Sequence, residues 1–366
     1  MKICVLISDL SSGGAERVAS LWVQGFVERG HNVSIILNSD LPIAFGIPES
    51  VSRYNMAIIT GNRVTKYLFY PLRLIKLRKH LKKTKPDVVI SVLHPMGIYA
   101  KLASFGLGCK IINTEHNSFE RPEDMPLPLI SRINKFYVNK FFDVVTVLTE
   151  VDKRIAQNKL HNVVVMPNPL PYQPYMSPRD KGRNKTILVV GRIDAWKTKG
   201  FDIILKVWDR MCVHYPDWNL IIAGKGRESN IDYLKSLSSN CLRNKQLLFR
   251  GFSEDMEQLY RSSEIFVLYS RHEGFGMALL EAMSQGCACV TSDFHGRQKE
   301  IVGDSGCALI VESVKEDELQ KALSKLLNDS ELRNNMGNKS VVRSSDYSLD
   351  KIMDKWDALL ENILIS

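Results

Sequence analysis

The sequence predicts an α/β protein built from two doubly wound domains, each with a parallel sheet. Three observations lead to this prediction. Short apolar, β-branched runs alternate with helical patterns along the chain, as they do in βαβ units. These runs fall into two series, separated by a proline-rich segment. A chain of 366 residues is too long for one small core and suits two domains of ordinary size.

The first series of runs belongs to the amino-terminal domain, and each run has the length and composition of a buried strand. The six predicted strands are residues 3–7, 33–37, 88–92, 110–113, 144–148 and 163–165. The second series predicts six strands of the carboxyl-terminal domain, at residues 187–190, 220–223, 247–249, 265–269, 288–291 and 308–311.

The domain boundary is predicted in residues 167–174, which hold four prolines. Proline does not fit inside a helix or a sheet, so this segment forms a stiff connector. We therefore assign residues 1–170 to the amino-terminal domain and 171–346 to the carboxyl-terminal domain. The final stretch carries apolar residues at helical spacing. It predicts a terminal helix, residues 347–366, that joins the amino-terminal domain.

Composition indicates a soluble globular protein, with 45% hydrophobic and 24% charged residues. No stretch approaches the roughly 20 apolar residues that cross a bilayer, and the short first apolar run is interpreted as a strand rather than a signal peptide. The seven scattered cysteines suggest buried thiols in a reducing compartment, hence the cytoplasm. Cys287 and Cys289 resemble half a metal site, but no partner pair accompanies them.

The net charge of +9 predicts an acidic partner, which could be nucleotide phosphate, anionic lipid or nucleic acid. Residues 63–85 contain nine basic residues, no acidic ones, and interleaved apolar residues. We expect a basic amphipathic helix lying on the inner face of an anionic membrane; the alternative is an ordinary helix with a solvated basic face. The residues assigned to membrane contact are Arg63, Lys66, Arg73, Lys76, Arg78, Lys79, Lys82 and Lys83.

The segment 269–283 carries the clearest signal for ligand binding. An apolar strand ends there, a glycine-bearing loop follows, and a helix opens near Gly276. Free amides and the dipole at such a helix start favour a diphosphate. Glu281, in the second turn, leans back toward that end and suits the ribose hydroxyls, while Glu273 on the loop can hold a sugar hydroxyl. The other expected ligand contacts are Gly274, Phe275, Met277 and Ala278.

Cations near this diphosphate are expected from residues 190–202, where Arg192 follows a strand and Lys199 opens a helix. Both can stabilise a departing nucleoside diphosphate, which a metal does in other transferases. Lys197 competes with Lys199 for this role. No Asp-x-Asp motif is available to hold a metal, so we predict none. Phe252 follows another strand and could flank the nucleobase, or simply pack.

The amino-terminal domain offers a second glycine loop, with Gly13 and Gly14 between a strand and a helix. His116 follows a further strand end and is expected to point into the same cleft, although a core histidine is the alternative. The third glycine of the dinucleotide-binding fingerprint is missing, which disfavours an NAD enzyme.

With these motifs in this order, the chain resembles over nearly its whole length the retaining GT-B glycosyltransferases of family four, especially bacterial members that build surface polysaccharides or lipid-linked glycans. Glu273 and Glu281 match the E-x7-E motif of that family, and Arg192 and Lys199 match its diphosphate-binding pair. The spacing from arginine to lysine is longer here than is usual, which keeps Lys197 as an alternative.

The resemblance extends to Gly13, Gly14 and His116, which match the glycine loop and the histidine of the acceptor domain. It implies two Rossmann-like domains facing a central cleft, and a reaction that keeps the anomeric configuration. The leaving diphosphate then helps to deprotonate the acceptor. The residues expected to take part in catalysis are Glu273, His116, Arg192 and Lys199.

The expected function is transfer of a hexose or N-acetylhexosamine from a nucleoside-diphosphate sugar to a polyprenyl-diphosphate-linked glycan, without a metal or other cofactor. UDP is expected because it is frequent in the family. One alternative is an epimerase or hydrolase of the same fold that needs no acceptor. A nucleic-acid-binding protein is disfavoured because aromatic stacking platforms and RNA motifs are missing.

Overall fold

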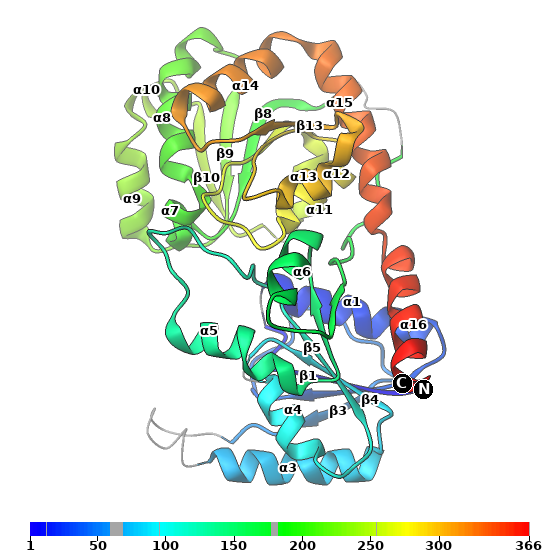
Figure 1. Ribbon diagram of the computed structural model, residues 1–366. Coiled ribbons are helices and arrows are strands. Elements are labelled where there is room, and N and C mark those ends of the chain that lie inside the picture. The colour runs from blue at the N-terminus through cyan, green and yellow to red at the C-terminus, as the bar shows by residue number, and fades with distance from the viewer. Residues whose placement is uncertain (12, 59–68, 95, 177–181, 254, 366) are drawn as a thin grey trace. The chain divides into compact units, whose positions relative to one another are not determined.

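The computed structural model describes residues 1–366 apart from residues 12, 59–68, 95, 177–181, 254 and 366. The chain divides into two compact units (Figure 1). Unit 1 comprises Met1–Pro171 together with Leu349–Ser366, and unit 2 comprises Tyr172–Ser348. Each unit contains one parallel sheet with helices around it, which confirms the predicted fold class.

Unit 1 has a seven-stranded parallel sheet in the order β3-β2-β1-β4-β5-β6-β7. The strands are β1 (Lys2–Ile7), β2 (Asn32–Leu37), β3 (Ser52–Asn55), β4 (Val88–Val92), β5 (Lys110–Thr114), β6 (Val144–Val147) and β7 (Val163–Val165). The sequence analysis did not predict β3. This strand lies at the sheet edge and is mostly exposed, so it lacks the apolar pattern of a buried strand.

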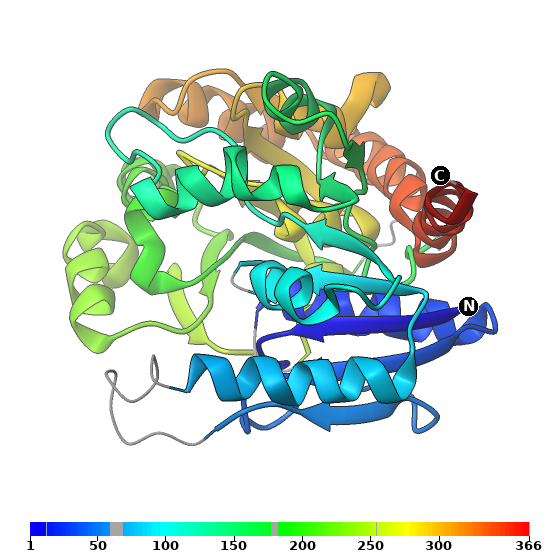
Figure 2. The ribbon, with the colours of Figure 1, turned by 60° about the horizontal axis from the view of Figure 1, so that its bottom comes forward.

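The helices of unit 1 are α1 (Gly14–Glu28), α3 (Tyr70–Thr84), α4 (Met96–Ser104), α5 (Leu129–Phe136), the 3-10 helix η1 (Val138–Phe141), α6 (Glu150–Gln157) and α16 (Leu349–Ile365). Leu77 of α3 and Tyr99 of α4 pack in one core cluster with strand residues such as Cys4 and Ile111. Figure 2 shows α3 and α4 side by side along one face of the sheet of unit 1. α16 packs on α1, where Trp356 and Trp22 meet edge to face at 5.0 Å.

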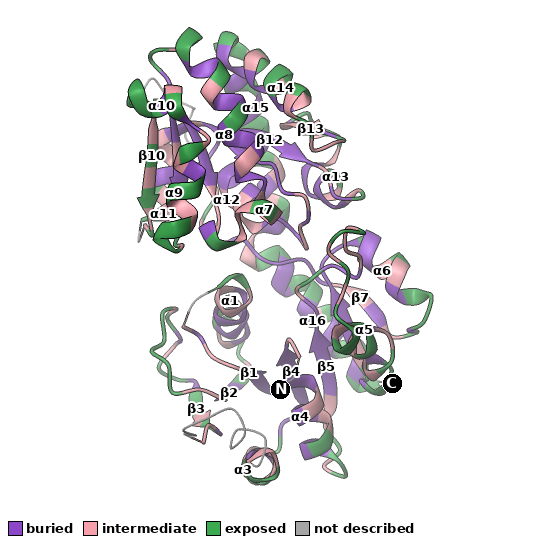
Figure 3. Ribbon diagram, turned by 90° about the vertical axis from the view of Figure 1, so that its left-hand side faces the viewer, coloured by how far each residue is buried: buried purple, intermediate pink, exposed green. Residues whose placement is uncertain are grey.

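Unit 2 has a six-stranded parallel sheet in the order β10-β9-β8-β11-β12-β13. Its strands are β8 (Asn184–Val190), β9 (Asn219–Ala223), β10 (Leu247–Gly251), β11 (Ser263–Leu268), β12 (Ala288–Ser292) and β13 (Ala308–Val311). Trp208 is fully buried in a core cluster with Ile187, Ile265 and Leu323. Figure 3 shows that buried residues fill the central strands of the sheet and line the inner sides of its helices, whereas the edge strand β10 is intermediate to exposed.

The helices of unit 2 begin with two short segments, η2 (Ile193–Ala195) and α7 (Trp196–Lys199). The remaining helices are α8 (Phe201–Met211), η3 (Cys212–His214), α9 (Glu228–Ser236), α10 (Ser239–Arg243), α11 (Met256–Ser262), α12 (Met277–Ser284), α13 (Arg297–Val302), η4 (Gly303–Ser305), α14 (Glu316–Asn328), α15 (Ser330–Ser344) and η5 (Ser345–Tyr347).

The basic stretch forms α3, but not all of its cations face outward. Arg73 is 4% exposed and donates a hydrogen bond to the Ile58 carbonyl oxygen at 3.4 Å. Its predicted membrane contact is therefore wrong, because Arg73 lies on the buried face of α3, which also carries Leu77 and Leu81. Arg78 is partly buried and donates to two carbonyl oxygens at the end of α4. Lys76, Lys79, Lys82 and Lys83 are exposed, whereas Arg63 and Lys66 lie outside the described residues.

Among the described residues, no helix is both long enough and apolar enough to cross a membrane. All seven cysteines are free thiols. Cys287 donates to the Tyr260 carbonyl oxygen at 3.1 Å, and Cys289 donates to the Cys287 carbonyl oxygen at 3.4 Å. Both thiols thus take part in the packing of β12.

Candidate functional site

The candidate donor site lies where the strand order of unit 2 reverses. β8 and β11 are neighbours in the sheet although they are not consecutive in the chain, so their outgoing segments leave in opposite directions. Ligands of open α/β sheets bind at the carboxyl ends of strands at such a switch point. Arg192 lies just after β8, and the loop 269–276 follows β11.

Lys199 and Glu273 meet at this point, although they are 74 residues apart in the chain. The Lys199 ammonium donates to Glu273 Oε1 at 2.5 Å, and the Ser270 hydroxyl donates to the same oxygen at 2.8 Å. Both charged side chains keep some exposure, 25% for Lys199 and 13% for Glu273. The structure thus brings a predicted cation and a predicted sugar-binding carboxylate into direct contact.

Arg271 fixes the loop against α7. Its guanidinium makes a two-pronged ion pair with the Asp202 carboxylate, with both distances 2.8 Å, and also donates to the Lys197 carbonyl oxygen. Its backbone amide donates to the Thr198 carbonyl oxygen at 2.8 Å. This bidentate geometry is strong and directional. It therefore holds the segment bearing Lys199 beside the loop bearing Glu273.

Arg192 and Lys197 are both exposed at the same strand end. The Arg192 guanidinium makes no hydrogen bond or ion pair with any other residue that the structure describes. Lys197 contributes its carbonyl oxygen to the contact with Arg271, while its side chain is exposed. Neither side chain is brought against Glu273, in contrast to Lys199.

α12 begins as predicted, with Gly276 as its N-cap at φ +96°, a conformation that favours glycine. The first amides of a helix have no partner within it, so those of Met277 and Ala278 are available for an anion. Gly274 is partly buried before them, and Phe275 is buried beneath the loop.

Glu281 lies in the second turn of α12, and the buried Tyr260 hydroxyl donates to its Oε2 at 2.8 Å. Burial, and then the Glu281 carboxylate, raise the pKa of Tyr260, so that its hydroxyl remains a donor. This hydrogen bond positions the carboxylate that was predicted to bind ribose.

Phe252 lies just after β10 and is 63% exposed. The Lys225 ammonium sits over its ring, 4.4 Å from the centroid. The ring is therefore a surface platform rather than part of the core, which weakens the packing alternative. Lys225 was not singled out from the sequence.

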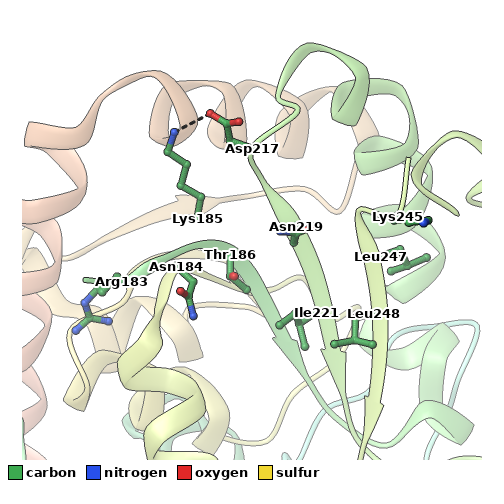
Figure 4. Close-up of a pocket in the computed structure, with 10 residues that line it drawn as sticks. All are labelled: Arg183, Asn184, Lys185, Thr186, Asp217, Asn219, Ile221, Lys245, Leu247 and Leu248. Atoms are coloured by element: carbon green, nitrogen blue, oxygen red, sulfur yellow. Dashed lines mark hydrogen bonds and ion pairs between the residues drawn. The ribbon is translucent and has the colours of Figure 1, made fainter. Parts of the chain in front are cut away.

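A hollow of unit 2, about 690 Å³, lies at the opposite end of the strands (Figure 4). It is lined by residues at the amino ends of β8, β9 and β10, including Thr186, Asn219 and Leu247, and by an ion pair of 3.0 Å between Lys185 and Asp217. None of the predicted donor-site residues lines it. Because ligands of such sheets bind at the carboxyl ends of the strands, we assign the donor site to the end at which Lys199 lies.

One group of possible metal ligands exists among the described residues, formed by Asp209, Cys212 and Cys241. The Asp209 carboxylate already accepts the backbone amides of Asn240 and Cys241. Burial raises the pKa of both thiols, which opposes the thiolate form that binds metals. The group belongs to the packing of α8 against α10, and contains none of the predicted site residues.

Unit 1 carries the other predicted residues, again beside its switch point, between β1 and β4. Gly13 caps α1 at φ +123°, and a Cβ there would lie 2.3 Å from a carboxylate oxygen of Glu16. Gly14 faces open space. Burial, with a smaller contribution from Asp9, raises the pKa of Glu16. The glycine loop therefore carries a carboxyl group that was not predicted from the sequence.

His116 follows β5 and packs against Trp22, with ring centroids 5.4 Å apart. Its Nε2 lies 3.1 Å from the Thr114 hydroxyl, and its Nδ1 has no hydrogen-bond partner among the described residues. Burial lowers the pKa of His116 to about 4, and the neighbouring Glu115 opposes this only in part. The imidazole is therefore neutral at neutral pH.

Glu115 is 3% exposed and lies at the centre of a polar cluster. Lys135 donates to its Oε2 at 2.8 Å, while His94 and Asn139 donate to its Oε1 at 2.8 and 3.0 Å. Burial alone would raise the pKa of Glu115, but the charges of Lys135 and His94 and their hydrogen bonds hold it well below its usual range. Glu115 is therefore a buried, fully paired carboxylate next to His116.

His94 and Gln298 lie close to these sites without having been predicted. His94 follows β4, and its Nδ1 finds no hydrogen-bond partner in the described part of the chain. The Gln298 side-chain nitrogen also lacks one and would lie 3.7 Å from a Cβ on Gly276, at the start of α12. A single polar residue without a spacing pattern gives no signal in the sequence.

Comparison with known proteins identifies the family. The model described as "Glycosyltransferase Family 4" matches residues 12–174, and the model described as "Glycosyl transferases group 1" matches residues 177–341. An uncharacterized glycosyltransferase of Haemophilus influenzae is 31% identical over 352 residues, covering 96% of this chain and 97% of that protein.

Two further proteins are similar over nearly the whole chain. A Campylobacter jejuni alpha-1,4-N-acetyl-D-galactosaminyltransferase, named for a PP-undecaprenol-linked acceptor, is 27% identical over 375 residues, which cover 99% of both chains. Anabaena Alr3699/HepE, solved in complex with UDP and glucose, has a TM-score of 0.77 at 19% identity and covers 99% of both chains. The chain therefore belongs to the GT-B glycosyltransferases, with a Family 4 domain followed by a group 1 domain.

Proposed function

We propose that this glycosyltransferase moves a hexose or N-acetylhexosamine from a UDP-sugar to a polyprenyl-diphosphate-linked glycan, with retention and without a metal ion. The observation that carries the proposal is the contact of Lys199 with Glu273 at the switch point of unit 2. It joins a cation suited to a diphosphate with a carboxylate suited to sugar hydroxyls. Arg192 and the start of α12 belong to the same sheet edge.

The diphosphate of the donor would be held by Arg192, by Lys199 and by the first amides of α12. The engagement of Lys199 with Glu273 supports Lys199 over Lys197 as the phosphate ligand. Glu281, oriented by Tyr260, would accept hydrogen bonds from the ribose hydroxyls. Phe252 offers an exposed aromatic face for the base. UDP is also the nucleotide in the solved HepE complex.

The proposed reaction breaks the bond between the anomeric carbon and a diphosphate oxygen. The acceptor oxygen bonds to the anomeric carbon on the same face, and its proton passes to the leaving diphosphate. Positive charge from Arg192 and Lys199 stabilises that leaving group, in the role that a metal takes elsewhere. Glu273 orients the sugar through a hydroxyl and is not a nucleophile. His116, held neutral, would hydrogen-bond the acceptor.

The acceptor class is suggested by the relative from Campylobacter jejuni, whose name specifies a PP-undecaprenol-linked glycan. The exposed lysines of α3 suit an enzyme that meets this acceptor as a peripheral protein at the inner face of the cytoplasmic membrane. Each basic residue near an anionic surface contributes about 1 kcal/mol of attraction. The lysines that remain for this role are Lys76, Lys79, Lys82 and Lys83.

The proposal predicts that activity survives chelation and depends on Arg192. We expect EDTA to leave turnover unchanged and Arg192→Ala to lower kcat about a hundredfold or more, because it removes a donor to the developing negative charge. UDP should raise the thermal midpoint more than GDP or ADP does, since only the folded state binds it. Arg243→Ala, at an exposed position of α10, is the matched control.

Loss of activity with EDTA and its recovery with manganese would contradict the metal-free mechanism. Release of UDP from the UDP-sugar at the same rate with and without a lipid-linked acceptor would point instead to a hydrolase or epimerase. A larger shift of the thermal midpoint with GDP than with UDP would indicate that GDP is the donor nucleotide.

A further inference from the structure

Helix α5 exposes a stripe of apolar side chains and buries a lysine. Leu129, Ile130 and Ile133 are 72%, 73% and 44% exposed, whereas Lys135 is 5% exposed. A surface helix of a globular protein normally buries its apolar stripe and exposes its charges. In α5 the apolar stripe is exposed and a lysine is buried, so the contacts of unit 1 leave this apolar side uncovered.

The apolar stripe continues past the end of α5 into η1. Tyr137 and Phe141 are 51% and 66% exposed. Together with Ile130 and Ile133 they follow steps of three or four residues, the spacing that keeps side chains on one helical face. We define the apolar surface of α5 by its five exposed side chains: Leu129, Ile130, Ile133, Tyr137 and Phe141.

The inward side of the same segment is held by buried polar contacts. Lys135 and Asn139, four residues apart, both donate to the Glu115 carboxylate, at 2.8 and 3.0 Å. Lys135 also donates to the Asn117 carbonyl oxygen at 2.8 Å and sits over the Phe119 ring. Turning the helix to bury its apolar stripe would leave a buried carboxylate without its cation, which is strongly unfavourable. The exposure of the apolar side is therefore built into the fold.

The surroundings of this surface carry positive charge. Residues 125–142 contain no acidic residue; the nearest in sequence are Asp124 and Asp143. Arg132 and Lys140 are exposed on the same segment. Lys140 and Lys159 lie over the Tyr137 ring, at 5.6 and 5.1 Å from its centroid. Apolar side chains bordered by tyrosine and lysine match the boundary between acyl chains and anionic headgroups.

We propose that the apolar surface of α5 inserts into the interface of an anionic lipid bilayer and anchors unit 1 there. The exposed lysines of α3, which belongs to the same unit, would add attraction to the headgroups. The inserted segment then lies beside Glu115 and His116 at the carboxyl end of β5. The nature of the acceptor rests on the proposed function, whereas the docking itself does not.

The test is sedimentation of the full chain with vesicles of phosphatidylcholine alone and mixed with phosphatidylglycerol. The first variant combines Leu129→Ser, Ile130→Ser and Ile133→Ser. Its matched control makes the same change at three exposed apolar positions of unit 2: Val213→Ser, Leu242→Ser and Val342→Ser. A second variant changes Lys76, Lys79, Lys82 and Lys83 to Glu, and leaves out the buried Arg73.

We expect the α5 variant to bind both kinds of vesicle at least about tenfold more weakly, because it removes three apolar side chains from insertion. The control should bind like the native protein. Phosphatidylglycerol should increase binding of the native protein, and salt should remove this increase. The α3 variant should lose only this salt-sensitive increase. In the α5 variant, the thermal shift by UDP and transfer to a short-chain, water-soluble acceptor should remain unchanged.

Three results would overturn the docking proposal. The native protein could stay in the supernatant with anionic vesicles at low salt, or the α5 variant could sediment as the native protein does. The native chain could also be a dimer in light scattering that the α5 variant converts to a monomer, in which case a second copy covers the surface. Vesicle binding without any sugar transfer would instead contradict the proposed function and leave the docking intact.

Discussion

At the residue scale, the strand ends of unit 1 place two histidines in different surroundings. His94 donates to the ionised Glu115, whereas His116 is enclosed beside Trp22. Burial of an imidazole disfavours its protonated form. His116 therefore keeps one lone pair and one N–H at neutral pH, which suits hydrogen bonding to a sugar hydroxyl better than donation of a proton.

The burial of His116 predicts its titration. Its pKa in the folded protein should be about 4, well below the ordinary 6.5. Between these values the unfolded chain binds a proton that the folded chain does not. The contribution of His116 to stability is therefore present above pH 6.5 and is lost as the pH falls toward 4. Imidazole resonances followed by NMR, with His116→Asn for assignment, would measure this. Titration of His116 near 6.5 would contradict the enclosed site.

Several site residues could be predicted from sequence because they occur with glycines just after apolar runs. Glu273 and Lys199 were found in this way, but their direct contact was not. That contact depends on which strands become neighbours, and short segments do not reveal this. Arg73 was misjudged because a run of cations does not tell which of them the helix turns inward.

At the element scale, the junction of α7 with α8 determines where Lys199 lies. Gly200 separates the two helices at φ +67°, and a Cβ there would lie 2.0 Å from the Tyr269 carbonyl oxygen. A side chain at this position is opposed both by the backbone conformation and by the available space. Glycine is thus required for the approach of Lys199 to the loop after β11.

We predict that Gly200→Ala lowers the free energy of unfolding by about 2 kcal/mol or more, because alanine is strained at positive φ and meets backbone there. It should also weaken UDP binding by moving Lys199. Urea denaturation and calorimetry would measure the two effects. Gly182→Ala, where a Cβ meets open space, is the control. Equal stability and UDP affinity in the two variants would show that the junction tolerates a side chain.

The orientation of α5 illustrates what periodicity leaves open. An apolar stripe at helical spacing tells which residues share a face. It does not tell whether that face packs on the protein core or contacts a partner outside the fold. In α5 the partner of Lys135 is Glu115, at a distant strand end, so its inward turn follows from tertiary contacts. Strand β3 was missed for a related reason, since an exposed edge strand needs no apolar alternation.

At the scale of the whole molecule, both units repeat one plan. In each unit the strand order of the parallel sheet reverses beside the first strand, β1 or β8. The glycine loop follows β1 in unit 1, and the cationic segment follows β8 in unit 2. The number of domains was predictable because twelve strands were visible as apolar runs. The return of the chain to unit 1 was suggested by the apolar stripe of its last helix, but its partners Trp22 and Gly25 only emerge from the fold.

The last helix should therefore stabilise unit 1 selectively. Trp356 is fully buried against Trp22 and Phe26, with ring centroids 5.0 and 5.6 Å away. Trp356→Ala should cost about 3–5 kcal/mol, the usual range when a large buried aromatic side chain is removed. We expect amide hydrogen exchange to quicken in α1 and in the strands of unit 1, because their protection includes this packing.

In the same experiment, exchange in β8 and β11 of unit 2 should stay close to that of the native chain. Leu364→Ala, at a position of α16 that is 44% exposed, controls for changes in the helix itself and should leave both units protected. UDP should slow exchange around α12 and α7 equally in the native chain and in Trp356→Ala, since the candidate donor site lies entirely in unit 2. If Trp356→Ala exposes the strands of both units to the same extent, the two sheets unfold together and the division of stability between the units is wrong.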